Sequence, residues 1–342
     1  MASSEAEPEP ARPSRPGGRA WIKVAIKSTL TVVVVLAVAR HVGKTLRDLN
    51  AKGESIRIEP AAFAAAIGLY IAGLVPLGVF YGRVLAASKT PIGRFAAIRA
   101  YLISHLGKYV PGKALVVVMR AGLSVPSGAR PATAAFATFY ETLVMMAAGG
   151  LLAALAFGAG SWVSIPLPFA AGRSLSVPLG LIGFVPGVAF LVVVEPRVFP
   201  KLATLARLPF RGVGADALPI VGWRLLAEGL LLAALGWTLM GLSQVAVLAA
   251  LGPSTRLAAE WPTIVGSVAL ATVAGFVVPI APGGLGVREW VLWTALASAI
   301  DRERAVVAAI VLRLAWIVGE VVAAALLVAI RGPVPAARVA SP

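Results

Sequence analysis

The sequence predicts an all-α fold, a polytopic transmembrane helical bundle. Of the 342 residues, 59% are hydrophobic and only 13% are charged, and the mean hydropathy is +0.88. A soluble chain of this length needs a much larger charged surface. The apolar residues gather in runs of about twenty, the length that crosses a hydrocarbon core of roughly 30 Å. The basic residues fall in the connections between these runs, so no separate water-soluble domain is expected.

Eight stretches are predicted to be membrane spans: Trp21–Val42, Ala61–Leu85, Pro131–Phe157, Leu175–Val194, Trp223–Leu251, Pro262–Ile280, Arg288–Ile300 and Ala305–Ile330. The stretch Arg288–Ile300 is too short to cross upright, so it either crosses or forms a re-entrant pair with the preceding segment. The stretch Ile92–Met119 is amphipathic and is expected to be interfacial or re-entrant. We therefore expect about eight spans, with re-entrant or broken helices around Ile92–Met119 and Pro262–Ile300.

The chain is predicted to form one membrane domain, residues 21–331, between a disordered cytoplasmic tail, residues 1–20, and a short cytoplasmic tail, residues 332–342. Between Arg83 and Arg130 there are basic residues and no acidic residue, which places this stretch in the cytoplasm. The expected location is the cell inner membrane, with both termini inside. Ala37-Val38-Ala39 imitates a signal-peptide cleavage site, so removal of the first apolar segment is the alternative to its retention as a span.

Composition and motif context argue against nucleic-acid binding and against cofactors. The formal net charge of +16 is spread over short connections and does not form one soluble basic face. The chain has no cysteine and two histidines, which leaves little for a metal site. Gly107 to Lys113 has the spacing of a phosphate-binding loop, but Ala114 stands where Ser or Thr would hold magnesium. No cofactor is expected.

Two irregular regions, one in each half of the chain, contain a Pro-Gly step beside basic residues: Pro111-Gly112 and Pro282-Gly283. Non-helical backbone at membrane depth persists only where it is buried in protein or lines a polar cavity. Transporters built from repeats place broken helices at corresponding positions, where helix ends face the substrate. An ordinary loop at a helix end is the alternative for each region. The segment Pro279–Glu289, with three glycines and a final Arg-Glu pair, is the stronger candidate.

Charged residues inside predicted spans are a second indication of a site, since each costs on the order of 3 kcal/mol at a helix centre. Glu141, Arg313 and Glu320 are such residues. Arg313 and Glu320 lie two turns apart on one helix face, roughly 10 Å, so they meet only through intervening groups. One of them could pair with Glu141 or Arg288 instead. A buried ion pair that only fixes helix register is the alternative.

Four motifs resemble the lysylphosphatidylglycerol synthase transmembrane family, the flippase half of the multiple peptide resistance factor. They are Leu-Gly-Lys-Tyr-Val-Pro-Gly-Lys within Tyr101–Lys113, Tyr140-Glu141, Ala-Pro-Gly-Gly-Leu-Gly-Val-Arg-Glu at Ala281–Glu289, and Leu312-Arg313. The resemblance runs from about Trp21 to Arg331. It implies a bacterial or archaeal inner-membrane protein that moves a phospholipid between leaflets or acts on another lipid-linked substrate.

The sequence departs from this family in two ways. The soluble aminoacyl transferase domain of the full-length resistance factor does not follow, so the synthase activity is not expected here. Thr142 follows Glu141, where many relatives carry arginine, so Glu141 is expected to need a distant partner.

We expect a flippase-like membrane protein, and not an enzyme, that translocates or binds a phospholipid or lipid-linked substrate. The alternative is a membrane-embedded transferase or scaffold subunit that acts on a polyprenyl phosphate or phospholipid with a separate soluble enzyme. The expected partners are membrane lipids, anionic ones above all. The candidate substrate-binding residues are Lys108, Tyr109, Pro111, Gly112, Lys113, Arg120, Glu141, Pro282, Gly283, Gly284, Gly286, Arg288, Glu289, Arg313 and Glu320.

The basic candidates are expected to act at two depths. Lys108, Lys113 and Arg120 would collect an anionic headgroup at the cytoplasmic side, where each basic group contributes about 1 kcal/mol. Arg288 and Arg313 would bind it deeper in the membrane. The glutamates would balance the arginines or receive a cationic group, and the glycines would let backbone amides approach a phosphate.

Overall fold

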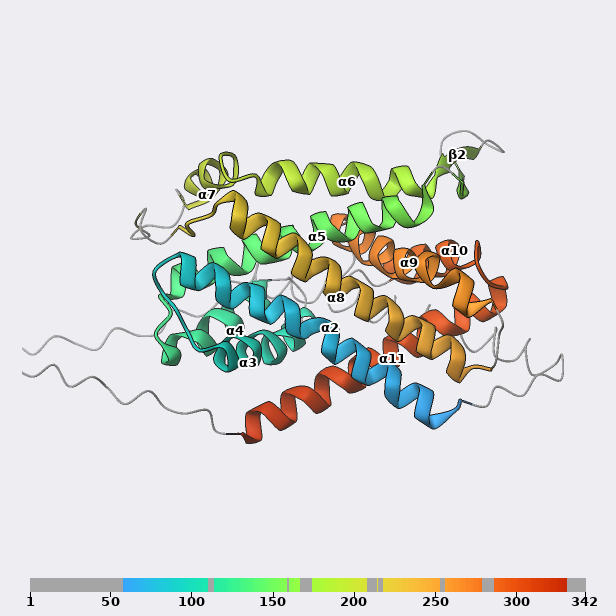
Figure 1. The fold of residues 1–342 in the computed structure, drawn as a ribbon, viewed down its shortest axis with the longest axis horizontal. Coiled ribbons are helices and arrows are strands. Elements are labelled where there is room, and N and C mark those ends of the chain that lie inside the picture. Colours follow the sequence, from blue (N-terminus) through green and yellow to red (C-terminus); the bar gives the residue numbers. More distant parts are fainter. Residues whose placement is uncertain are drawn as a thin grey trace, which may run out of the picture.

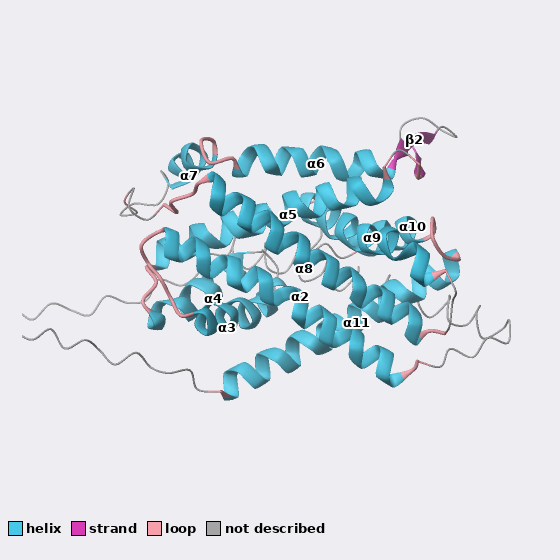
Figure 2. Cartoon of the chain, in the orientation of Figure 1, coloured by secondary structure: helices cyan, strands magenta, loops and turns pink. Residues whose placement is uncertain are grey.

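The computed structural model describes residues 58–109, 114–158, 160–166, 174–207, 214, 218–252, 256–278 and 286–330. Within this part of the chain there are ten α-helices, two short 3-10 helices and one two-stranded hairpin. The all-α fold class is confirmed, and Figure 2 shows how little of the chain is strand. The first predicted span, Trp21–Val42, and both predicted tails lie outside the described residues.

Five helices of the described part are long and apolar enough to cross a membrane: α2 (Pro60–Ala87), α5 (Pro131–Phe157), α8 (Trp223–Ala250), α9 (Leu257–Val277) and α11 (Arg302–Ala329). A sixth candidate is a bent pair, α6 (Leu179–Val194) and α7 (Phe199–Arg207), whose axes differ by 77°. In Figure 1, α2 and α8 run side by side through the middle of the bundle. These helices confirm a polytopic bundle.

The described residues hold five or six candidate spans, fewer than the predicted spans that fall on them, and local structure explains the difference. Arg288–Ile300 forms only α10 (Val287–Leu296), a ten-residue helix about 15 Å long, which covers half of a hydrocarbon core. The predicted span Leu175–Val194 begins as a helix only at Leu179. Its first residues belong to strand β2 (Ser174–Pro178), which pairs antiparallel with β1 (Trp162–Pro166). The sequence analysis did not predict this hairpin.

The amphipathic stretch Ile92–Met119 forms broken helices, as expected. Its elements are α3 (Arg94–Ser104), the 3-10 helix η1 (His105–Tyr109) and α4 (Ala114–Ser124), and a second 3-10 helix, η2 (Val125–Ser127), follows. With eleven residues each, α3 and α4 are about 16 Å long and cannot cross alone. Figure 1 shows them as a short pair at one end of the bundle, below α2. The η1 turn between them carries polar side chains into the bundle.

Glycines on α5 allow close helix packing, which a membrane bundle needs because lipid tails are as apolar as the helices. A Cβ added at Gly150 would lie 2.6 Å from the Gly187 Cα of α6, so these two backbones touch. A Cβ at Gly149 would lie 2.8 Å from the indole ring of Trp237, which donates a 2.8 Å hydrogen bond to the Met145 carbonyl. These two glycines therefore let α5 pack closely against α6 and α8 (Trp223–Ala250).

Candidate functional site

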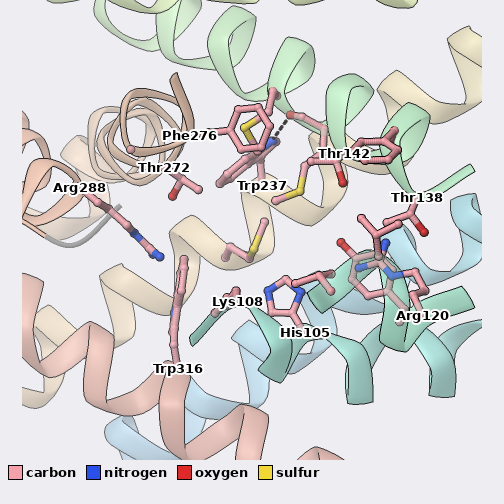
Figure 3. Close-up of a pocket in the computed structure, with 18 of the residues that line it drawn as sticks. His105, Lys108, Arg120, Thr138, Thr142, Trp237, Thr272, Phe276, Arg288 and Trp316 are labelled. Atoms are coloured by element: carbon pink, nitrogen blue, oxygen red, sulfur yellow. Dashed lines mark hydrogen bonds between the residues drawn. The ribbon is translucent and has the colours of Figure 1, made fainter. Parts of the chain in front are cut away.

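A cavity of about 250 Å³ lies inside the bundle. Its lining comes from η1 and from every helix of the described part except α6 and α7. Most of the lining is apolar, including Val117, Met145 and Phe276, but three basic side chains reach it: Lys108, Arg120 and Arg288. Figure 3 shows Arg288 and Arg120 toward opposite sides of this space, with His105 and Lys108 between them. The cavity therefore combines cationic groups with an apolar wall.

Arg120 and Glu141 form a buried ion pair between α4 and α5. The Arg120 Nη1 lies 2.8 Å from the Glu141 Oε2, and the two residues are 2% and 1% exposed. The Arg120 Nε donates to the Ser104 Oγ at 3.0 Å, and the Tyr101 hydroxyl donates to the Glu141 Oε1 at 3.1 Å. The guanidinium carbon also lies 3.9 Å from the centroid of the Tyr101 ring. Both charges are thus neutralised and hydrogen-bonded.

The Arg120–Glu141 pair differs from the expected location of Arg120 and agrees with the expectation that Glu141 has a distant partner. Arg120 was expected to collect headgroups at the surface, but its side chain is buried because Glu141 compensates its charge. Glu141 was expected to need a distant partner, and Arg120 lies 21 residues earlier in the chain. The suggestion that Arg313 or Glu320 pairs with Glu141 is wrong, since both contact other groups.

Glu320 of α11 joins three elements of the bundle. Its Oε1 accepts hydrogen bonds from the Tyr70 hydroxyl of α2 and the Lys108 ammonium of η1. The Lys108 Nζ also lies 3.3 Å from the Tyr70 hydroxyl, and the His105 Nε2 lies 3.8 Å from the same carboxylate oxygen. Lys108 was expected at the cytoplasmic surface. The structure places it in the cavity wall, where Glu320 balances its charge.

Glu289 of α10 binds Arg313 and caps its own helix. Arg313 Nη1 donates to Glu289 Oε1, while Glu289 Oε2 accepts a 2.7 Å hydrogen bond from the backbone N–H of Gly286. Gly286 has a φ of +86°, a backbone conformation that favours glycine. This one-sided cap, from the Glu289 side chain to the Gly286 N–H, holds the start of α10. Arg313 therefore pairs with Glu289 of α10 and not with Glu141, and Glu320 pairs with Lys108 and not with Arg288.

Arg288 stacks on an aromatic pair. Its guanidinium carbon lies 4.3 Å from the centroid of the Trp316 ring, and Trp316 stacks on Tyr70 with centroids 4.1 Å apart and ring planes 10° apart. The Trp316 indole N–H donates to the Ser243 hydroxyl at 3.2 Å, which orients the ring. Arg288 thus lies against a fixed platform in the cavity wall, and within the described ranges no carboxylate forms an ion pair with it.

The sequence analysis missed Trp316 and Tyr70. Trp316 lies three residues after Arg313 and four before Glu320, so helical spacing puts all three on one face of α11, a signal that could have found it. Tyr70 lies in a uniformly apolar stretch without such a signal. Of the predicted site residues, Tyr109 is 39% exposed, with its ring centroid 5.2 Å from the Lys108 ammonium. Pro111, Gly112, Lys113, Pro282, Gly283 and Gly284 lie outside the described residues.

The bundle and its partly charged cavity define a polytopic helical membrane protein with a polar site in its interior. The family model for the lysylphosphatidylglycerol synthase TM region matches residues 21–331. The chain belongs to this family, so the resemblance carried by the four motifs is confirmed. No curated protein matches the chain.

Proposed function

We propose that this protein binds a phospholipid or lipid-linked substrate in the cavity and moves it between the leaflets without changing it chemically. The observation that supports this proposal is the composition of the cavity wall. Basic groups from η1, α4 and α10 face the same space as apolar side chains from α4, α5 and α9. An amphiphile has the same division into a charged head and an apolar tail, so both of its parts find matching surroundings.

The basic groups would act on the headgroup and the apolar wall on the tail. A phosphate taken from water into a membrane loses hydration that is worth many kcal/mol unless charged donors replace it. Lys108 and Arg288 lie in one wall of the cavity, next to Tyr70 and Trp316. Val117, Met145 and Phe276 would contact the lipid chain. The protein thereby lowers the barrier that otherwise keeps a charged headgroup in its leaflet.

We propose the cell inner membrane as the location, with both termini in the cytoplasm. The basis is the stretch from Arg83 to Arg130, which has basic residues and no acidic one. Labelling of single cysteines at the two ends of the chain with an impermeant thiol reagent in intact cells tests the orientation. The chain has no native cysteine to interfere. Labelling of either terminus without permeabilisation contradicts this orientation.

The direct test of function is movement of fluorescent phosphatidylglycerol and phosphatidylcholine across vesicles that contain the purified protein. Arg288→Ala and Glu289→Ala are compared with the wild type at equal reconstitution. We expect movement in the wild type and its loss in both variants, because the first removes a cavity cation and the second frees Arg313 and uncaps α10. Arg224→Gln, an exposed change at the start of α8 outside the cavity lining, is the matched control.

Two results would reject the proposal in different ways. Wild-type movement that persists in both variants would mean that lipid crosses elsewhere on the protein. No movement of either lipid would reject autonomous transport of phospholipids. In that case lipid-linked sugars become the next substrates to test, and copurification would show whether a separate lipid-modifying enzyme binds the protein. Mass spectrometry of the vesicle lipids after the assay tests the claim that the substrate is unchanged.

A further inference from the structure

The charged groups in and next to the cavity do not balance. Three carboxylates each pair with one basic side chain: Glu141 with Arg120, Glu320 with Lys108, and Glu289 with Arg313. A fourth basic side chain, Arg288, lines the cavity and forms no ion pair within the ranges that the structure describes. Within the described part of the chain, these four cations and three anions leave one unit of positive charge, and Arg288 is the cation without an ion pair.

His105 does not change this balance. It lies 3.8 Å from the same Glu320 oxygen that Lys108 already contacts, so no uncompensated carboxylate is left to favour its charged form. An ordinary histidine has a pKa of about 6.5 and is neutral above that pH. At pH 7.5 and above, the cavity therefore keeps a single uncompensated cation.

The surroundings of Arg288 leave its hydrogen-bonding edge available. The guanidinium carbon lies 4.3 Å from the centroid of the Trp316 ring, and the attraction of a cation to an aromatic ring does not require a hydrogen bond from its N–H donors. The nearest carboxylate in sequence, Glu289, is occupied by Arg313 and by the Gly286 N–H. Among the residues that the structure describes, none forms an ion pair with Arg288, so its guanidinium can bind a phosphate by two parallel N–H donors.

An uncompensated arginine in a membrane protein is costly, and a bound anion would remove that cost. We infer that the cavity takes a lipid headgroup with a single net negative charge, a phosphodiester bound by Arg288, and disfavours headgroups in which an ammonium group cancels the phosphate. This inference rests on the binding half of the proposed function and names its substrate class. A zwitterionic headgroup would bring a further cation next to Lys108 and Arg288, where Glu141, Glu289 and Glu320 of the described residues each already have a basic partner.

The test is equilibrium binding to the purified protein in detergent at pH 7.5, followed by native mass spectrometry. The probes are dioctanoyl phosphatidylglycerol, dioctanoyl phosphatidylcholine and inorganic phosphate. We expect the wild type to bind phosphatidylglycerol at least about tenfold more tightly than phosphatidylcholine, and inorganic phosphate more weakly than either, because it lacks the chain that the apolar wall contacts. Arg288→Gln should bring the two lipids within about twofold of each other. Arg288→Lys keeps the charge and should keep the preference, with weaker binding.

Arg224→Gln is the control for a lost surface charge and should match the wild type. Equal binding of the two lipids by the wild type, or a preference that survives Arg288→Gln, would overturn the inference. Displacement of the lipid by equimolar inorganic phosphate would also overturn it, since the site would then bind a free anion. Selective binding that disappears in Arg288→Gln, without lipid movement in vesicles, would support the inference and reject only translocation. The binding assay therefore tests this inference, and the vesicle assay tests translocation, independently of each other.

Discussion

The buried pair Arg120–Glu141 allows a quantitative test, because within the pair each charge compensates the other. Removing one member of a buried ion pair costs about 3–5 kcal/mol, since the charge left behind has no partner. We therefore expect Arg120→Met and Glu141→Leu each to lower the free energy of unfolding by that amount. If the two penalties were independent, the double variant would lose about 6–10 kcal/mol.

The structure predicts a much smaller loss for the double variant. With both charges gone, the main remaining defect is the Tyr101 hydroxyl, which loses its acceptor on Glu141. A buried hydroxyl without a partner costs about 1–3 kcal/mol, and this is the loss that we expect. Titration with sodium dodecyl sulfate in mixed micelles, followed by tryptophan fluorescence, measures all three variants. Arg224→Met, an exposed change on α8, is the control. A double variant that loses the sum of the single penalties would refute the reasoning.

Two further predictions concern packing and surface charge. Gly150→Val should destabilise the bundle by several kcal/mol and broaden its elution in size-exclusion chromatography, because the added Cβ would lie 2.6 Å from the Gly187 Cα. The control is Gly68→Val, because a Cβ at Gly68 meets nothing within 4 Å. An equal effect of the two substitutions would contradict the prediction. Arg83→Gln should lower the free energy of unfolding by less than about 1 kcal/mol, because the side chains of its ion pair, Arg83 and Glu228, are 49% and 32% exposed. A larger loss in the same unfolding titration would contradict this.

The sequence predicted the long helices well because membrane insertion depends on one simple property, the length of an apolar run. It failed where a short element has the same composition as a span. Residues Ser174–Pro178 carry no charge, like the helix that follows, but they pair with Trp162–Pro166 as a strand. Arg288–Ile300 was expected either to cross or to form a re-entrant pair, and in the structure its helix α10 has only ten residues. The hydropathy of a segment does not show which other segment it pairs with.

The candidate residues of the site were predictable by type, and their partners were not. Glutamates and arginines inside apolar runs stand out because their burial is costly. The partner of each depends on how helices pack. Glu320 contacts Lys108, which is 212 residues away, and Glu141 contacts Arg120 on the neighbouring helix. Spacing within one helix restricts which residues share a face, but it cannot tell which other helix that face meets.

Three side chains on one face of helix α11 contact the site. Arg313 contacts α10, Trp316 contacts Arg288 and Tyr70, and Glu320 contacts Tyr70 and Lys108. Because these three residues lie at i, i+3 and i+7 of a stiff rod, a rotation or one-turn slide of α11 would exchange or break all of these contacts together. A change in the cavity would then be concerted, with two discrete arrangements and few stable ones between them.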